Sequence, residues 1–262
     1  MAEEQALVPK VEPAATALAA NRPAFLPAAA EGTEHITKDD IRLPKLAIAQ
    51  GLSDQLKRGN PKQIPGLQLA QLFNDLTGEI YGPAYETKLD FFIVRADPPR
   101  WVEFIPRDQG GGVKDLDVPP GDPRTLWSTD EKGERVKPIA TMFYDFVLCL
   151  WPTRELIVLS LKSSGIKIAK ALNGLITLRN APLWSGKYSV AVADEPSANG
   201  PFPNFVIKNA GWVAKEDDAK YLKGLFDSLR NRVIHIEREP GDDDAPPAPA
   251  AAGAGDGKDI PF

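Results

Sequence analysis

Aromatic and basic residues recur together through the middle of the chain, in a pattern that suits the binding of a strand. They are Arg100, Trp101, Phe104, Arg107, Trp127, Lys162, Lys167, Lys170, Trp184 and Lys187. A groove for a single-stranded nucleic acid needs cations for the phosphates and flat rings on which the bases stack. These residues are therefore the candidate DNA-binding set, although core packing or a solvated helix face would explain several of them equally well.

Residues that could perform catalysis or hold a metal show no usable pattern. The two histidines, His35 and His235, and the single cysteine, Cys149, match no metal-ligand spacing. Residues 185–188 resemble part of a phosphate-binding loop, but Tyr188 stands where that loop requires Ser or Thr. The sequence therefore predicts a protein that is not an enzyme and holds no cofactor or metal. A metal nuclease built from scattered carboxylates stays an alternative.

A second kind of site lies at the end of the chain. Three aspartates at 242–244 open an acidic segment, a Pro/Ala/Gly spacer follows, and the last residues are Asp259, Ile260, Pro261 and Phe262. Such a composition buries too little apolar surface to offset the entropy of ordering, so the segment is predicted to be disordered. Its apolar tip and free carboxylate suit a partner's pocket, since capture of a C-terminal carboxylate is a known recognition mode. These four residues are the candidate partner-binding site.

Charge divides the chain into three parts. Residues 1–40 carry 3 basic and 7 acidic residues, residues 41–235 carry 26 and 22, and residues 236–262 carry 2 and 7. A mildly basic body between acidic ends is compatible with an anionic ligand, although the excess of positive charge is small. We predict a disordered acidic Ala/Pro-rich arm over 1–40, a binding domain over 41–236 and a disordered acidic tail over 237–262.

The composition also bears on the compartment. No apolar run approaches the roughly 20 residues needed to cross a bilayer, and the first residues resemble neither a secretory signal nor a transit peptide. With Cys149 as its only cysteine, the chain can form no internal disulfide. We expect a cytoplasmic protein, in the host cytoplasm if the gene is viral.

Hydrophobic patterning predicts a mainly β fold with helices. Strands are expected over 89–95, 100–107, 141–151, 155–161, 184–193 and 202–213, and helices over 166–178 and 216–236. Residues 163–165 are expected to cap the first helix, and residues 108–138 read as a long polar loop. A helix between the third and fourth barrel strands is the element order of the OB-fold, so an OB-fold-like Greek-key barrel with a C-terminal helix is predicted.

Three segments carry a resemblance to a known family. WVEFIPRDQGGG at 101–112, LSLKSSGIKIAKALNGLI at 159–176 and the terminal DIPF together resemble a phage-type single-stranded DNA-binding protein. That resemblance covers 41–235 and the tail, and it implies DNA contacts at Trp101, Arg107, Lys167 and Lys170. It also implies that the tip recruits replication or repair proteins. The long 108–138 loop and the 1–35 arm depart from the compact bacterial members of the family.

Two functions follow as hypotheses. In the first, the protein binds single-stranded DNA with little sequence specificity during phage DNA replication or recombination, and its tip recruits partner enzymes. In the alternative, the body does not bind DNA, and the DIPF tail mimics a host tip to capture host repair enzymes. The oligomeric state, the site size and the choice between DNA and RNA stay open.

Overall fold

The computed structural model describes residues 43–106, 109–197 and 200–230. Arg107 and the tip residues Asp259, Ile260, Pro261 and Phe262 lie outside the described residues, as do the predicted arm 1–40 and tail 237–262. The described chain forms two compact units. The first contains residues 43–100 and 142–230, and the second contains residues 101–141. Each unit is described by itself.

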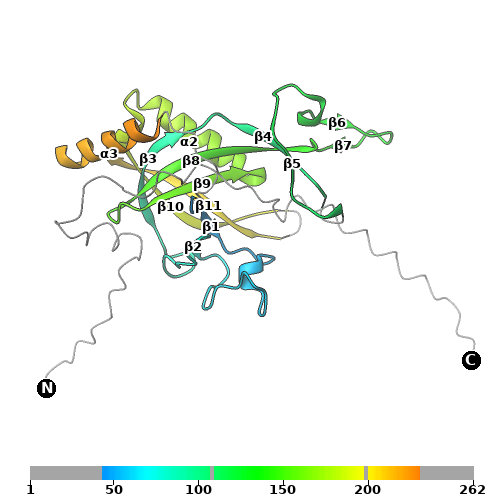
Figure 1. The fold of residues 1–262 in the computed structure, drawn as a ribbon, viewed down its shortest axis with the longest axis horizontal. Helices are drawn as coiled ribbons and strands as arrows, with labels where there is room; N and C mark the ends of the chain where they lie inside the picture. Colours follow the sequence, from blue (N-terminus) through cyan, green and yellow to red (C-terminus); the bar gives the residue numbers. More distant parts are fainter. Residues whose placement is uncertain (1–42, 107–108, 198–199, 231–262) are drawn as a thin grey trace, which may run out of the picture. The chain divides into compact units, whose positions relative to one another are not determined.

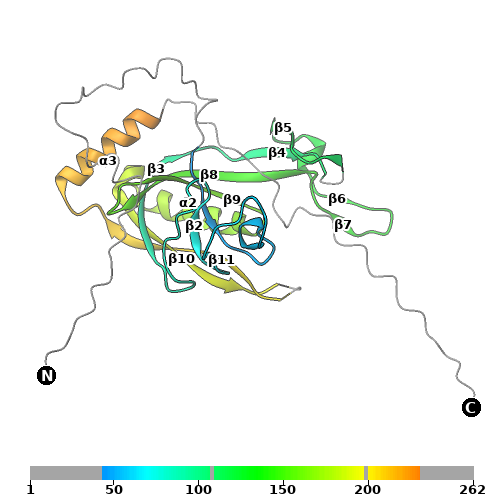
Figure 2. The same cartoon turned by 60° about the horizontal axis from the view of Figure 1, so that its bottom comes forward.

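Five antiparallel strands make up the main sheet of the first unit (Figures 1 and 2). They are β3 (Leu89–Ala96), β8 (Ala140–Trp151, whose first two residues belong to the second unit), β9 (Leu156–Lys162), β10 (Gly186–Glu195) and β11 (Phe202–Trp212). Their order is β11-β10-β3-β8-β9. Long runs of aromatic and β-branched residues, which favour strands, explain why these segments extend.

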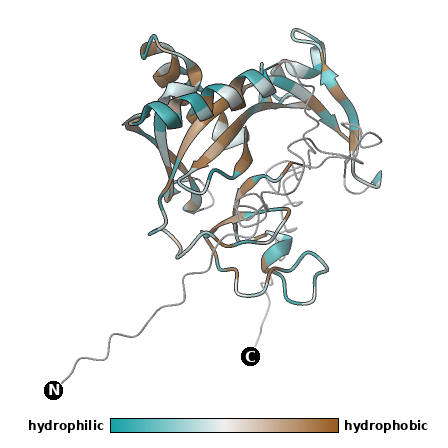
Figure 3. Ribbon diagram, turned by 60° about the vertical axis from the view of Figure 1, so that its left-hand side comes forward, coloured by the Kyte–Doolittle hydropathy of each residue, from teal (hydrophilic) through white to brown (hydrophobic). Residues whose placement is uncertain are grey.

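Both faces of this sheet are buried, which explains why β3 and β8 read as continuous apolar runs rather than alternating ones. Successive side chains of a strand point to opposite faces. Phe91 and Ile93 accordingly join one apolar cluster, and Phe92 and Val94 join another. Figure 3 shows the apolar stretches in brown along the long strands.

Each face is covered by one helix. Helix α2 (Ile166–Leu178) places Leu172 in the cluster of Phe91, and helix α3 (Glu216–Leu229) places Leu222 in the cluster of Phe92. The helix predicted over 166–178 is confirmed at both ends. The second helix begins where predicted, at three carboxylates that suit the positive end of the helix dipole.

The cap predicted for α2 is wrong in its chemistry. Residues Ser163–Gly165 form a 3-10 turn, η5, that runs directly into the helix, and no side chain caps the first backbone amides. The turn therefore sets the start of α2 through backbone geometry, because Gly165 is already in helical conformation.

The mainly β class with two helices is confirmed, but the barrel is not closed. A small antiparallel pair, β1 (Leu46–Ile48) and β2 (Leu72–Asn74), lies beside the sheet, joined to β9 by a single parallel bridge between Lys45 and Val158. Within the described residues no ladder connects β11 to β9. The first unit is thus an open, helix-covered sheet.

The second unit corrects the prediction of a long loop over 108–138. It contains β4 (Arg100–Phe104, of which Arg100 belongs to the first unit), β5 (Val113–Val118), a 3-10 turn η4 (Pro123–Thr125), β6 (Ser128–Thr129) and β7 (Arg135–Val136). The strand predicted over 100–107 ends at Phe104. Of the six residues of β5 only Val118 is buried. The hydrophobic pattern of residues 113–118 therefore does not predict a strand. Pairing with β4, not apolar burial, holds it extended.

Candidate nucleic-acid interface

Three members of the candidate DNA-binding set lie on β4. Arg100 opens the strand in the first unit, and Trp101 and Phe104 follow in the second, all three part-buried. Trp101 pairs with Val118 of β5, and Phe104 pairs with Val113. The β4–β5 ladder fixes the backbone of Trp101 and Phe104, and none of the three side chains is fully exposed. Arg107, the fourth member from this segment, lies outside the described residues.

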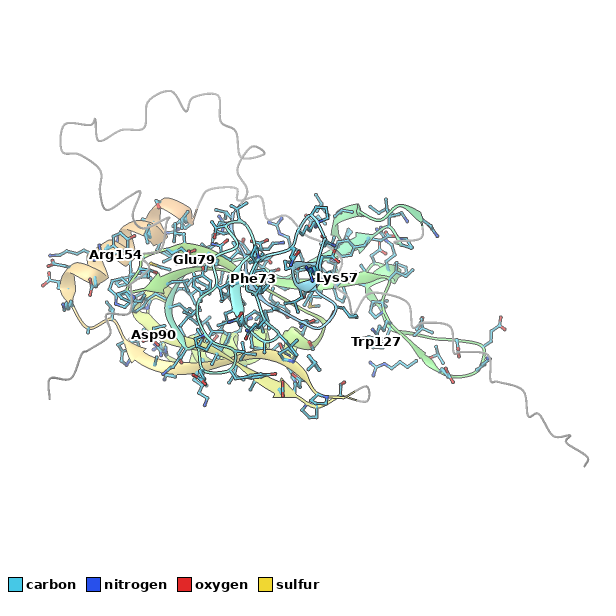
Figure 4. The ribbon with its side chains drawn as sticks, turned by 90° about the horizontal axis from the view of Figure 1, so that it is seen from below. Lys57, Phe73, Glu79, Asp90, Trp127 and Arg154 are labelled. Atoms are coloured by element: carbon cyan, nitrogen blue, oxygen red, sulfur yellow. The ribbon has the colours of Figure 1, made fainter. Side chains whose placement is uncertain are left out.

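Trp127 is the exposed aromatic of the second unit, with 52% of its surface accessible (labelled in Figure 4). The guanidinium of Arg135 lies 4.1 Å from the centre of its ring. The β6–β7 pair explains the contact. Arg135 stands opposite Thr129. Thr129 follows Trp127 by two positions, so the side chains of Thr129 and Trp127 point to the same face, beside Arg135. Trp127 and Arg135 together offer an open aromatic surface beside a cation.

Arg124, also near Trp127 in sequence, is occupied by carboxylates. The Oε1 atom of buried Glu103 lies 2.6 Å from Lys114 Nζ, and its Oε2 atom lies 2.7 Å from Arg124 Nη1. Arg124 also contacts Asp115 at 3.1 Å and Asp122 at 2.9 Å. This network is the polar centre of the second unit, and it leaves Arg124 committed to three anions.

The same network lowers two carboxyl pKa values. Hydrogen bonds from Lys114 and then Arg124 hold the pKa of Glu103 below its ordinary value of 4.5. Side-chain and backbone hydrogen bonds from Arg124 lower the pKa of Asp122 to about 2. Both groups are therefore charged at neutral pH, and the network is intact there.

The lysines of the first unit are spread over separate elements. Lys167 on α2 is exposed and ion-paired with Glu195, whereas Lys170, one turn further, is exposed and has no ion pair among the described residues. Lys162, at the end of β9, lies 5.4 Å from the ring of Phe143. Lys187 Nζ lies 2.6 Å from Asp90 Oδ2 (Asp90 is labelled in Figure 4). Local carboxylates thus already offset the charges of Lys167 and Lys187.

Two tryptophans of the first unit differ in exposure. Trp184, a member of the candidate DNA-binding set, lies in the 3-10 turn η6 (Leu183–Ser185), where it is part-buried and packs against the cluster that α3 covers. Trp212, which is outside that set, is 53% exposed at the end of β11. Its ring centre lies 4.6 Å from the guanidinium of Arg179. The sequence carries no signal for this pair, because 33 positions separate the two residues.

An apolar groove runs beside helix α2. It has a volume of about 490 Å³ and is lined by α2 residues including Ile168 and Leu175 and by β11 residues including Phe205 and Ile207. Lys167 and Glu195, which form an ion pair, are also among the residues that line it. Its lining suits an apolar group rather than a chain of phosphates.

The comparisons with known proteins identify one family. A family model described as Pam3 phage gp34-like protein matches residues 14–234, most of the chain. The chain belongs to this family. The match spans both units of the gp34-like chain and stops before the tail, so it says nothing of the DIPF tip. No curated protein and no solved structure matches it.

Two kinds of feature are missing from the described part of the gp34-like chain. Among residues 43–106, 109–197 and 200–230, no three His, Cys, Asp or Glu side chains are grouped so that they could hold a metal ion. No helix within those ranges is long and apolar enough to cross a membrane.

Proposed function

We propose that this gp34-like protein binds single-stranded DNA with little sequence specificity, in the replication or recombination of phage DNA in the host cytoplasm. The observation that carries the proposal is a repeated pairing: each unit presents a half-exposed tryptophan against an arginine. Trp127 has Arg135 beside it, and Trp212 has Arg179. An exposed flat ring with a cation over its other side is a surface on which an unpaired base can stack. The phage protein in the family's name agrees with the proposed setting.

The role is one of binding, not catalysis. Base stacking needs only a π face and is therefore tolerant of sequence, since every base has one. The exposed Lys170 and the mildly basic body supply the electrostatic part of the attraction, which is sequence-independent. The paired lysines Lys167 and Lys187 contribute less to it, because Glu195 and Asp90 already offset their charge.

The tail supplies a second, separable activity in this proposal. Asp259, Ile260, Pro261 and Phe262 recruit a replication or repair protein by placing an apolar side chain and the terminal carboxylate in its pocket. The family match ends at residue 234, so this part of the proposal rests on the tail residues alone. Deleting 256–262 should abolish partner binding and leave DNA affinity unchanged or higher. Weaker DNA binding after that deletion would contradict this division.

The experiment is a titration of the full chain with fluorescent oligo-dT, beside duplex DNA of equal length, at several salt concentrations. We expect tight binding of the single strand that weakens steadily with salt, because released counterions produce that slope. The form lacking 256–262 is the matched control for competition by the acidic tail. If neither form binds oligo-dT at low salt, the proposal fails and the alternative of a tail-only interaction protein takes its place.

A further inference from the structure

We propose that Trp212 is a platform for one base of a single strand, and that Arg179 is the residue that positions it. The assignment rests on the proposed function of binding single-stranded nucleic acid. The assignment adds one specific contact, at the start of β10 and the end of β11. Neither Trp212 nor Arg179 belongs to the candidate DNA-binding set.

A continuous stack leads from the core to the exposed indole. Phe91 is fully buried, and its ring centre lies 5.7 Å from that of Tyr188, which is 1% exposed. The guanidinium of Arg179 lies 4.5 Å from the ring of Tyr188 and 4.6 Å from the ring of Trp212. Arg179 therefore stands between an immobile core ring and a half-exposed ring. With one face on the guanidinium, the indole has its other face available for a ligand.

The hydrogen bonds of Arg179 fit a positioning role. Its Nη2 donates to the carbonyl of Lys187 at 3.1 Å and to Oδ1 of Asn209. Its Nε and Nη1 are buried and have no hydrogen-bond partner among the described residues. The flanking rings, rather than a full set of acceptors, thus hold most of the guanidinium. Two of the three guanidinium nitrogens are therefore shielded from a phosphate, and the third is bonded to Lys187 and Asn209.

Gly186 makes this stack possible. It pairs with Trp212 across the β10–β11 ladder. A Cβ at position 186 would lie 2.3 Å from Nη1 of Arg179 and 2.9 Å from the hydroxyl of Tyr188. A side chain there would push the flexible guanidinium out of its place. The glycine of segment 185–188 is therefore explained by close approach of Arg179, and not by a phosphate-binding loop.

The ligand that fits is an unpaired base. The platform is a single flat, electron-rich face, and a base inside a duplex is already stacked on both sides and cannot offer its own face. A protein aromatic side chain could occupy the same surface, which would appear in the test as Trp212 being dispensable for DNA.

The test compares four variants of the full chain in the oligo-dT titration: Trp212→Ala, Arg179→Ala, Gly186→Ala and the double variant Trp212→Ala/Arg179→Ala. Leu178→Ala is the matched control, because Leu178 adjoins Arg179 and is 85% exposed. Thermal unfolding of each variant checks that it folds, and Trp212→Phe keeps a ring at the platform if Trp212→Ala does not fold.

We expect Trp212→Ala to weaken binding by about 5- to 150-fold, as the loss of one stacked base does. Arg179→Ala and Gly186→Ala should each weaken binding by less than Trp212→Ala does. Trp212→Phe should keep most of the affinity, and Leu178→Ala should leave the affinity unchanged. The double variant should be no worse than Trp212→Ala, because Arg179 acts through the indole. The slope of affinity against salt should be the same for Arg179→Ala and the unchanged protein.

Three results would overturn the assignment, and they differ from one another. If the unchanged protein and Trp212→Ala bind oligo-dT equally well, Trp212 is not a platform, and the proposed function still stands. A salt slope reduced by about 0.7 in Arg179→Ala means a direct phosphate contact, so the positioning role is wrong. No binding of oligo-dT by the unchanged protein removes the platform together with the proposed function.

Discussion

The two units of this chain are stabilised in different ways. The first buries aromatic and aliphatic side chains on both faces of its sheet, among them Phe91, Phe92 and Leu148. In the second, the buried apolar side chains among residues 101–106 and 109–141 are only Val102, Val118 and Ala140. Its centre is instead the buried Glu103 with its ion pairs. One unit therefore depends on the hydrophobic effect, which is insensitive to pH, and the other depends on charges that acid can remove.

The same contrast distinguishes the two exposed tryptophans. Trp212 lies on a stack that reaches the buried Phe91 through Arg179 and Tyr188. Trp127 has the guanidinium of Arg135 over its ring, and the adjacent strands β6 and β7 have only two residues each. A surface that is held in place before binding loses less conformational entropy when its ligand arrives. The first unit is thus expected to present the more ordered platform.

The largest effect is expected in the core of the first unit. Phe91→Ala should lower the free energy of unfolding by about 3–5 kcal/mol, because it leaves a cavity beneath Tyr188 in a close-packed interior. Denaturant unfolding followed by tryptophan fluorescence measures it. Leu178→Ala, at a highly exposed position, is the control and should stay within about 0.5 kcal/mol. A loss below about 1 kcal/mol for Phe91→Ala would mean that the stack has no rigid base.

Replacing Trp127 tests whether the second unit takes part in DNA binding. Trp127→Ala should weaken oligo-dT binding by about 1–3 kcal/mol if its ring stacks a base. The stability should stay almost unchanged, since the side chain is 52% exposed. The titration is done beside thermal unfolding, with Trp127→Phe as the variant that keeps a ring. Equal affinity for Trp127→Ala and the unchanged protein would confine binding to the first unit.

Acid should loosen the second unit before the first. The pKa of Glu103 lies below its ordinary 4.5 and that of Asp122 is lowered from 3.8 to about 2 in the folded protein. Folded-state pKa values below the unfolded ones mean that these groups stabilise the fold above about pH 4.5, and that this contribution is lost as pH falls towards 2.

Hydrogen exchange followed by mass spectrometry checks this order. Peptides from β5 should lose protection at a higher pH than peptides from β8 and β10. Glu103→Gln keeps the shape of the side chain but removes its charge, so it should loosen β5 already at neutral pH. Simultaneous loss of protection in both units would show that they do not open independently.

The smallest effects are expected for the lysines of α2. Lys170→Ala should change stability by less than about 0.5 kcal/mol. If a strand passes along this helix, the salt slope should fall by about 0.7, the value for one phosphate contact with a single strand. Lys167→Ala is the comparison, and its slope should fall less because Glu195 already pairs with Lys167. A larger change for Lys167 than for Lys170 would reverse this ranking.

Parts of the fold that depend on local patterning could be predicted from the sequence. The apolar spacing of α2 places Ala169 and Leu172 on its buried side, and its limits at Ile166 and Leu178 are as predicted. The long strand β8 is apolar on both faces and was recognisable for that reason. Strands β5, β6 and β7 could not be recognised, because their residues are mostly exposed and only pairing with a neighbour holds them extended.

The sequence by itself determined the mainly β class, the two helices and the residue types available for stacking and charge. These follow from periodicity and composition, which are local properties. Only the tertiary structure decided which tryptophans are exposed and which cations are already paired. Trp184 is part-buried because α3 packs on its side of the sheet, whereas Trp212 stays 53% exposed with Arg179, which Gly186 leaves room for, over its ring. Contacts between residues far apart in the chain set both outcomes, and no local pattern encodes such contacts.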